Sequence, residues 1–375
     1  MDVRRVLVRG LVAGLLVPLG VAAPAWAAAP EGVAVGCGDT VTGPAYLATD
    51  LDCDGVGVRL GADASLDLAG HVLDGGGSGT GVLVTNPAGG GAQSVSGGTL
   101  RGWDVAVRSD DVWPPESEAS VDRQVVDVTF RDNVTAVGWG RDPAWWGTLA
   151  VHGSRFVGND LAVESFFHGQ VTADGSTFAR NAEVVVARAS RVVLRGADLR
   201  DNDVVVALVG EGDVLVEDSV LVRNRVVVGG TKQWGSVRIE RSTVRRSDVV
   251  VAPGGVESST WLVDDVLTDN AVVVDLVGES GGVVGSTFRR NGVAVRASAP
   301  AEGLGPFQVL DSTFRRNGDA ILTTGPVELG GNLVTHSTGW GVLAPGAVDL
   351  GGNVASGNGH EPQCTGVVCA SRPRS

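Results

Sequence analysis

One pattern of apolar and polar positions recurs through most of the chain. Each copy runs from an apolar residue through Ser or Thr to Phe or Leu, then Arg or Asp, then Asn, and then a β-branched run; the clearest copies are STFRRNG at 286–292 and at 312–318. The marking residue of successive copies is Asn133, Asn159, Asn181, Asn202, Asn224, Ser247 (in place of Asn), Asn270, Asn291 and Asn317. The steps between these marks are 26, 22, 21, 22, 23, 23, 21 and 26 residues. A repeat near 22 residues is typical of a solenoid, in which one structural unit stacks on the next.

The residues after each mark predict strands. Valine runs such as 204–206 and 272–274 are bounded by Asn and Gly, which is a strand signal. No copy holds a helical pattern of useful length, and 56 glycines leave little room for helices. We therefore expect an all-β chain whose coils consist of short strands and turns, with each strand pairing in parallel with the coils before and after it.

Two other kinds of solenoid fit the pattern less well. A leucine-rich repeat also carries an Asn, but it needs a leucine-bearing return segment that is missing here, and Leu where this chain has Ser154, Ser176, Ser219, Ser242, Ser286 and Ser312. A calcium-binding nonapeptide roll needs a Gly-Gly-x-Gly-x-Asp pattern at nonapeptide spacing, which the glycine-rich stretches 74–81 and 89–98 do not keep.

The coil length, the turn Asn and the stacked Phe positions resemble the pectate-lyase-like right-handed parallel β-helix superfamily over residues 56–358. The segment LDLAGHVLDG at 66–75 is similar to the opening motif of secreted bacterial right-handed β-helix repeat proteins. The resemblance implies a single-stranded, right-handed parallel β-helix solenoid of roughly 10–12 coils of about 22 residues each.

The N-terminal segment predicts export. Residues 1–27 combine three arginines, an apolar stretch over 11–23 and a small-x-small end, which together indicate a secretory signal peptide, and no later segment is apolar enough to span a membrane. The formal net charge is −14, and removing this segment (three Arg, one Asp) makes it −16. An acidic, secreted chain is a poor partner for nucleic acid, and we expect an extracellular monomer.

The four cysteines lie in two pairs, one near each end of the chain. In an exported protein they are expected to form disulfides, and a stack of about a dozen coils holds its two ends too far apart for any pairing other than Cys37–Cys53 and Cys364–Cys369. A zinc site is the weaker alternative, since no histidine cluster accompanies them. The predicted organisation is a signal peptide at 1–27, an N-terminal cap at 28–55, the β-helix at 56–358 and a C-terminal cap at 359–375.

Positions that recur are expected to stack as ladders. The column three residues before the mark is predicted to be an interior stack, and the Asn column a ladder of amides at a turn. The column five residues after the mark is predicted to face outward; its members are Gly138, Glu164, Ala207, Gly229, Ala252, Asp275, Arg296 and Leu322. The column three residues after the mark, mostly Ala and Val from Ala136 to Ala320, is also expected on this outer face, which would make the face largely apolar.

Candidate chemistry gathers where the repeat is interrupted. Insertions at 110–118 and 139–146 carry four tryptophans, and exposed indole faces suit sugar rings carried on loops of a rigid solenoid. The candidate ligand-binding residues are Trp113, Trp139, Asp142, Trp145 and Trp146. The alternative is that these tryptophans fold back and cover the apolar outer face.

We expect a non-catalytic protein that binds an extracellular polysaccharide or a protein partner through these loops, without a cofactor or a metal. The alternative is a uronan lyase or C5-epimerase, in which Arg141 would hold the substrate carboxylate and Glu164 or His168 would act as base. Glu164 and Asp275 lie five coils apart, about 24 Å, too far to form a glycosidase carboxylate pair. Asp275 and Arg296 lie one coil apart and are expected to form a surface ion pair. A second alternative is a structural surface spacer.

Overall fold

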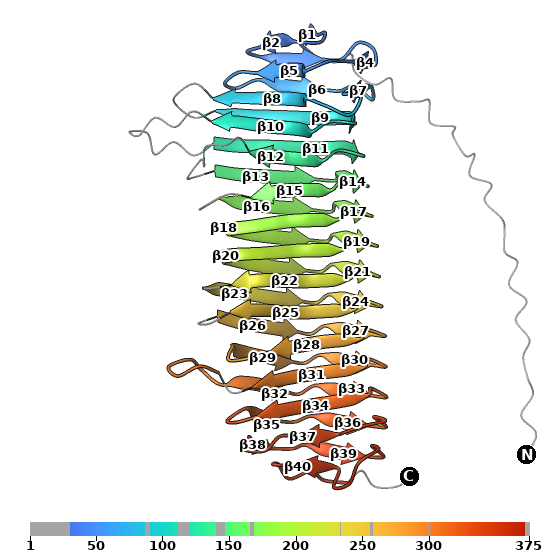
Figure 1. Cartoon of the computed structure of the whole chain (residues 1–375), viewed down its shortest axis with the longest axis vertical. Helices are drawn as coiled ribbons and strands as arrows, with labels where there is room; N and C mark the ends of the chain where they lie inside the picture. The colour runs from blue at the N-terminus through green and yellow to red at the C-terminus, as the bar shows by residue number, and fades with distance from the viewer. Residues whose placement is uncertain are drawn as a thin grey trace, which may run out of the picture. The chain divides into compact units, whose positions relative to one another are not determined.

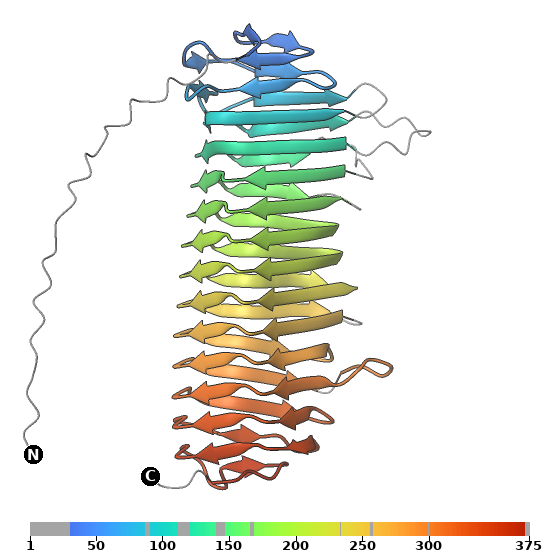
Figure 2. The ribbon, with the colours of Figure 1, turned by 180° about the vertical axis from the view of Figure 1, so that it is seen from behind.

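The computed structural model describes residues 31–86, 91–111, 121–139, 147–165, 169–232, 234–255, 258–298 and 300–371. The regular secondary structure of these residues is β-strand throughout, and the strands pair in parallel with their counterparts in neighbouring coils. The coils stack into a β-solenoid of about 13 turns (Figures 1 and 2). The all-β, parallel solenoid with coils of about 22 residues is confirmed.

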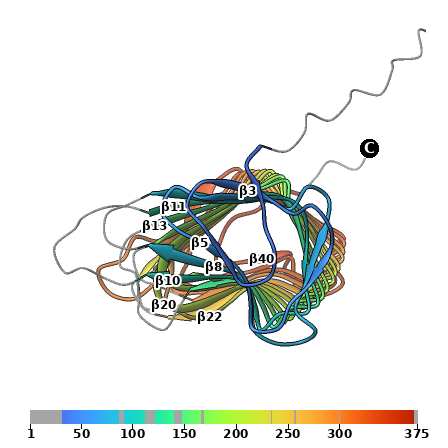
Figure 3. The same ribbon diagram turned by 90° about the horizontal axis from the view of Figure 1, so that it is seen from above.

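Each coil presents three faces, here called A, B and C, seen end-on in Figure 3. Face A holds short strands: β4 (Leu51–Asp52), β7 (Val72–Asp74), the ends of β9 (Ala92–Arg101) and β11 (Val121–Arg131), β14 (Arg155–Val157), β17 (Thr177–Ala179), β19 (Asp198–Arg200), β21 (Val220–Val222), β24 (Thr243–Arg245), β27 (Val266–Thr268), β30 (Thr287–Arg289), β33 (Thr313–Arg315), β36 (Leu333–Thr335) and β39 (Val354–Ser356).

Face B follows the marking Asn. It holds β2 (Asp39–Val41), β5 (Val56–Leu60), β8 (Thr80–Asn86), β10 (Val105–Asp111), β12 (Thr135–Trp139), β15 (Leu161–Ser165), the starts of β18 (Glu183–Arg195) and β20 (Val204–Glu217), β22 (Val226–Lys232), β25 (Val249–Gly255), β28 (Val272–Leu276), β31 (Val293–Ser298), β34 (Asp319–Thr324), β37 (Val342–Leu343) and β40 (Cys364–Thr365).

Face C completes the coil. It holds β1 (Val33–Ala34), β3 (Pro44–Tyr46), β6 (Ser65–Asp67), the starts of β9 and β11, β13 (Gly147–His152), β16 (Gln170–Asp174), the ends of β18 and β20, β23 (Gly235–Glu240), β26 (Ser258–Val263), β29 (Ser280–Val284), β32 (Phe307–Leu310), β35 (Glu328–Gly330) and β38 (Val348–Gly351).

The predicted interior stack is confirmed. Phe130, Phe156 and Phe178 are fully buried and stack ring on ring, with centroids 4.7 and 4.8 Å apart. Phe288 and Phe314 repeat the contact at 4.7 Å. Strand register forces this stacking, because each Phe pairs with the equivalent residue one strand spacing away.

The Asn ladder is confirmed as well, and it shows why the amide recurs. The Oδ1 of Asn202 accepts hydrogen bonds from the backbone N–H and the Nδ2 of Asn181, each at 3.0 Å. The Nδ2 of Asn202 donates to the Phe178 carbonyl at 3.0 Å and to Asn224 Oδ1 at 3.0 Å. Each buried Asn thus satisfies main-chain groups at the corner between faces A and B that no strand partner reaches.

A second ladder lies at the corner between faces C and A. Here a Ser hydroxyl takes the place of the amide, as where Ser154 N–H donates to Ser176 Oγ at 3.2 Å and Ser219 N–H to Ser242 Oγ at 3.1 Å. The residue before each ladder position has left-handed backbone geometry, for example Asp201 (φ 58°) and Arg241 (φ 49°). The sequence accordingly places Asp, Arg or Gly there and keeps β-branched residues out.

One prediction about the outer surface was wrong. The column from Ala136 to Ala320, three residues after each mark, is fully buried rather than exposed. Strand pairing skips this position, as where Leu161 pairs with Glu183 and Val163 with Val185. Two consecutive side chains therefore point inward where the chain turns from face A onto face B. The outward residues are those two and five after the mark, so Val204 and Ala207 stand on the outer surface instead.

The two ends of the chain belong to the stack. Strands β2, β3 and β4, within the expected N-terminal cap, already pair in parallel with β5, β6 and β7, which helps to account for about 13 turns where roughly 10–12 were expected. The disulfides Cys37–Cys53 and Cys364–Cys369 are both formed, with Cα atoms 5.5 and 6.1 Å apart, so the local pairing is confirmed.

Candidate functional site at the corner between faces B and C

The corner between faces B and C differs from the other two corners. Over the described residues no Asn or Ser ladder crosses it, and the numbers of residues that connect face B to face C differ from coil to coil; residues 300–306, between β31 and β32, project at the left edge of Figure 1. In β18 and β20 the chain instead passes from face B to face C within one continuous strand. Variable connections on a regular scaffold are where a solenoid accommodates function.

Most of the residues predicted to form the site lie outside the part of the chain that the structure describes. These are Trp113, Arg141, Asp142, Trp145, Trp146 and His168. Trp139 ends β12, and only its backbone is described. The structure therefore does not test whether these side chains lie near Glu164, and their roles stay predictions.

Trp103 has a structural role. Its side chain is buried, with its Nε1 donating to the Leu73 carbonyl at 3.0 Å, and its backbone N–H donates to Asn133 Oδ1 at 3.1 Å. It occupies the ladder position one coil before Asn133 and fills the interior there.

Glu164 lies on the outer surface of face B, on β15. Its pKa is raised because partial burial penalises the charged carboxylate, and the Arg188 guanidinium offsets part of that rise. Gly138, one coil earlier, lies close to the carboxylate: a Cβ built there would stand 3.8 Å from Glu164 Oε2 and only 2.9 Å from Thr135 Cγ2. Arg188 extends from β18, the next coil, where Val186 pairs with Glu164. Glu164 is thus a carboxylate with a raised pKa that lies near the Arg188 guanidinium.

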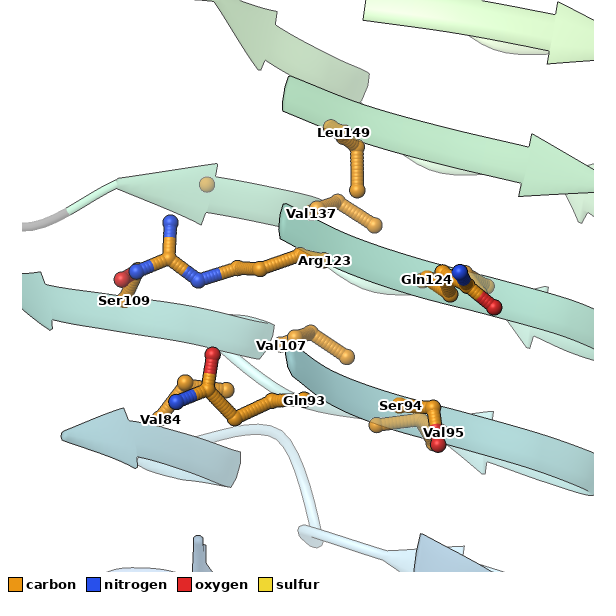
Figure 4. A pocket seen from close by; sticks show the side chains of 12 residues that line it. Val84, Gln93, Ser94, Val95, Val107, Ser109, Arg123, Gln124, Val137 and Leu149 are labelled. Carbon is orange, nitrogen blue, oxygen red and sulfur yellow. The ribbon is translucent and has the colours of Figure 1, made fainter. Parts of the chain in front are cut away.

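A cluster of polar side chains lies on β9, β10 and β11, inside the solenoid (Figure 4). Gln93 on β9, Ser109 on β10 and Arg123 on β11 are 2, 3 and 5% exposed and line a cavity of about 20 Å³ together with valines. Within the described residues, the amide of Gln93 and the hydroxyl of Ser109 have no hydrogen-bond partner. Such a cavity has the size of about one water molecule, and its accessible wall is almost entirely apolar.

A groove of about 360 Å³ opens at the same corner, across β16, β18, β20 and β23. Its polar lining consists of Gln170, Arg191, Glu211 and Asp213, and the side chain of Trp234 stands beside them. Trp234 is 57% exposed, an unusual state for a residue whose large apolar surface favours burial. The groove therefore combines an accessible indole with hydrogen-bonding groups of both charges.

A second groove, of about 340 Å³, opens on face B near its C-terminal end. Asp275 and Arg296 lie at this groove, 3.3 Å apart from Oδ2 to Nη1, which confirms the predicted surface ion pair. Its other walls are mainly apolar and include Leu322 and the 74%-exposed Val277.

Comparison of the sequence with protein-family models and with curated proteins finds no match. Among the described residues, no three His, Cys, Asp or Glu side chains gather closely enough to hold a metal ion. Over the same residues, no helix has the length and apolar character needed to cross a membrane.

Sequence reasoning missed the groove at Trp234. The tryptophan stands alone between Gln233 and Gly235, away from the tryptophan-rich insertions. The residues directly after the valine runs of these coils, Ala187, Ala207 and Gly229, are small and uncharged, so they give no signal of the groove. The lining residues come from four coils, and the register that aligns them emerges only from the folded strands.

Proposed function

We propose that the protein is an exported, non-catalytic member of the pectate-lyase-like β-helix superfamily that binds an extracellular polysaccharide along the corner between faces B and C. The observation that carries the proposal is the groove in which the exposed indole of Trp234 stands beside Gln170, Arg191 and Asp213. Carbohydrate sites combine an apolar platform for the sugar ring with a few polar groups for its hydroxyls. A spacer without a ligand gives no reason to expose an indole in such a groove.

The test is a glycan array probed with the mature protein and with a Trp234→Ala variant. We expect binding to at least one polysaccharide class and a clear loss of signal in the variant. If the mature protein binds no glycan on the array, the proposal is contradicted. The double variant Trp113→Ala with Trp145→Ala tests whether the tryptophan-bearing insertions take part in binding.

One observation favours the alternative of a uronan lyase or C5-epimerase. Glu164 combines a raised pKa with a neighbouring cation, Arg188, at a half-buried position on the outer surface of face B. A base that removes the C5 proton and a cation that holds the substrate carboxylate are the groups that this reaction needs. Asp142-Pro143 resembles part of the Asp-Pro-His of alginate epimerases, with Ala144 in the place of the His. Release of unsaturated uronate from alginate or polygalacturonate, abolished by Glu164→Gln, would establish the lyase; its absence favours binding alone.

A further inference from the structure

The lining of the Trp234 groove is aligned with the axis of the stack. Gln170 pairs with Arg191 and Arg191 with Asp213 on successive strands, and all three side chains are exposed. Trp234 stands one coil further on, directly before β23. Four coils separated by one strand spacing each give a row about 14 Å long. A ligand that contacts the whole row therefore lies along the stack and not across it.

The floor of the groove consists of backbone. Gly212 and Gly235 both have positive φ, 156° and 118°, and Gly212 N–H donates to the Trp234 carbonyl at 3.1 Å. A Cβ at Gly235 would clash with the Gly212 carbonyl, and one at Gly212 would lie 2.8 Å from the Ser190 carbonyl. Glycine is thus required at both positions, because each lies directly against the backbone of the preceding coil.

The cause of the groove is the way β18 and β20 turn the corner. Their register shifts between Arg188 and Ser190, where Ala189 has left-handed geometry (φ 47°). This bulge lets the chain bend from face B to face C without a projecting loop. The groove lies over these two bends, between Gly169 on one side and Trp234 on the other.

The charges in the groove favour an uncharged ligand. Glu211 and Asp213 contribute two carboxylates and Arg191 one guanidinium, within a chain of net charge −14. Asp213 Oδ1 already accepts hydrogen bonds from Ser236 N–H at 2.8 Å and Ser236 Oγ at 2.7 Å, which fixes the carboxylate in place. Carboxylates and a guanidinium all bond well to sugar hydroxyls, whereas a uronate polymer would bring one carboxylate per sugar against the carboxylates of Glu211 and Asp213.

We propose that this groove binds a neutral hexose polymer, aligned with the stack, with one sugar ring packed on the indole of Trp234. The inference rests on the proposed polysaccharide-binding function and adds the chemical class of the ligand and its orientation. It also separates this site from the lyase alternative, because a lyase acts on uronates.

The experiment is isothermal titration of the full mature protein with soluble oligosaccharides of two classes. The neutral probes are glucan, mannan and galactan oligomers, and the acidic probes are oligogalacturonate and oligoalginate. We expect the protein to bind at least one neutral probe, and to bind it more tightly than either acidic probe. Trp234→Ala should weaken that binding about tenfold or more, and Trp234→Phe should restore part of it.

Trp340→Ala is the control: it removes an indole that stacks on His360 far from the groove, and it should leave binding unchanged. Glu211→Gln, inside the groove, tests the charge argument: it should raise the affinity for acidic oligomers relative to that for the neutral oligomer. Circular dichroism and thermal unfolding of each variant establish that the solenoid is intact.

The outcomes separate the inference from the function on which it rests. Tighter binding of acidic than of neutral oligomers would overturn the neutral class, and glycan binding that survives Trp234→Ala in a folded variant would overturn the groove; polysaccharide binding would stand in both cases. Absence of binding to every oligomer, together with an empty glycan array, would overturn both.

Discussion

Asp265 interrupts the ladder of Ser hydroxyls at the corner between faces C and A, and its replacement by Asn should stabilise the protein near neutral pH. Its Oδ1 accepts from Ser242 N–H at 2.8 Å and its Oδ2 from Val263 N–H at 3.1 Å. Even so, burial raises the pKa of Asp265 to about 7 from the ordinary value of 3.8. The two hydrogen bonds oppose that rise without cancelling it, because burial in the packed corner penalises the charged form more.

The sign and size of the effect follow from proton linkage. The folded state holds the Asp265 proton more tightly than the unfolded state, so the stability contributed by the neutral acid is present below pH 4 and is lost as the pH rises toward 7. A rise of about three pKa units corresponds to about 4 kcal/mol over the full window, and to roughly 2–3 kcal/mol between pH 5 and pH 8. Asn carries no charge, so Asp265→Asn should escape this loss.

The chain supplies its own precedent for the substitution. Asn332 occupies the equivalent ladder position, where its Oδ1 accepts from Ser312 N–H at 3.1 Å and its Nδ2 donates to the Val309 carbonyl at 2.7 Å. An Asn at 265 should accept from Ser242 N–H and donate to the Ile239 carbonyl. Its Nδ2 cannot accept from Val263 N–H as Asp265 Oδ2 does, which costs a part of the gain that does not depend on pH. Steric fit is therefore not the quantity under test.

The assay is urea unfolding of wild type and Asp265→Asn at several pH values from 5 to 8. Taking the difference between the two proteins at each pH removes the contribution of the groups that they share. We expect the advantage of the variant to grow by roughly 2–3 kcal/mol over this range. The reverse exchange, Asn332→Asp, should introduce a pH dependence of the same sign. A difference that stays constant from pH 5 to pH 8 would refute the argument, whatever its absolute size.

Three further substitutions test other parts of the stack. Ser247→Asn should raise the free energy of unfolding, measured in urea, by about 1–2 kcal/mol. The new amide oxygen would accept a hydrogen bond from Asn224 Nδ2, as in the other coils, whereas the Ser247 hydroxyl has no hydrogen-bond partner among the described residues. Gln93→Met should raise it by about 1–3 kcal/mol by removing an unsatisfied buried amide at similar volume, and a drop instead would indicate a bound water in the cavity. Removing the Cys37–Cys53 bridge by a double Ser substitution should lower it by about 3 kcal/mol, since the bridge closes a separation of 16 residues; an unchanged midpoint and unchanged proteolysis of the first coil would contradict this.

The architecture was predictable because the same residues recur at the same place in successive coils. A Phe at one position of a coil requires space in the interior, and its counterparts at Phe156 and Phe178 meet the same requirement one strand spacing away. The Asn ladder was predictable for a related reason, since an amide can both accept from one coil and donate to the next. In both cases the repeat itself identifies the contacts.

The outer face was predicted less well because alternation was assumed to begin directly after the Asn. The corner places the residues three and four after the mark, such as Ala162 and Val163, both in the interior. A strict two-residue alternation along a strand holds only after the bend is complete. Local sequence contains no marker of that bend, because Ala and Val are acceptable on either side of a sheet.

The candidate site depends on departures from the repeat, and these carry two kinds of information. Insertions are visible in the sequence as longer spacings between marks, and the tryptophan-rich segments lie in such insertions. The Trp234 groove has the opposite origin: it lies where β18 and β20 pass the corner as continuous strands, without a projecting loop. At this groove, the backbone at Gly212 and Gly235 lies between the coils, and Trp234 in the next coil supplies the aromatic wall. The spacing between marks therefore indicates where the connections at this corner become longer or shorter. Only the register of the strands shows which side chains line the groove.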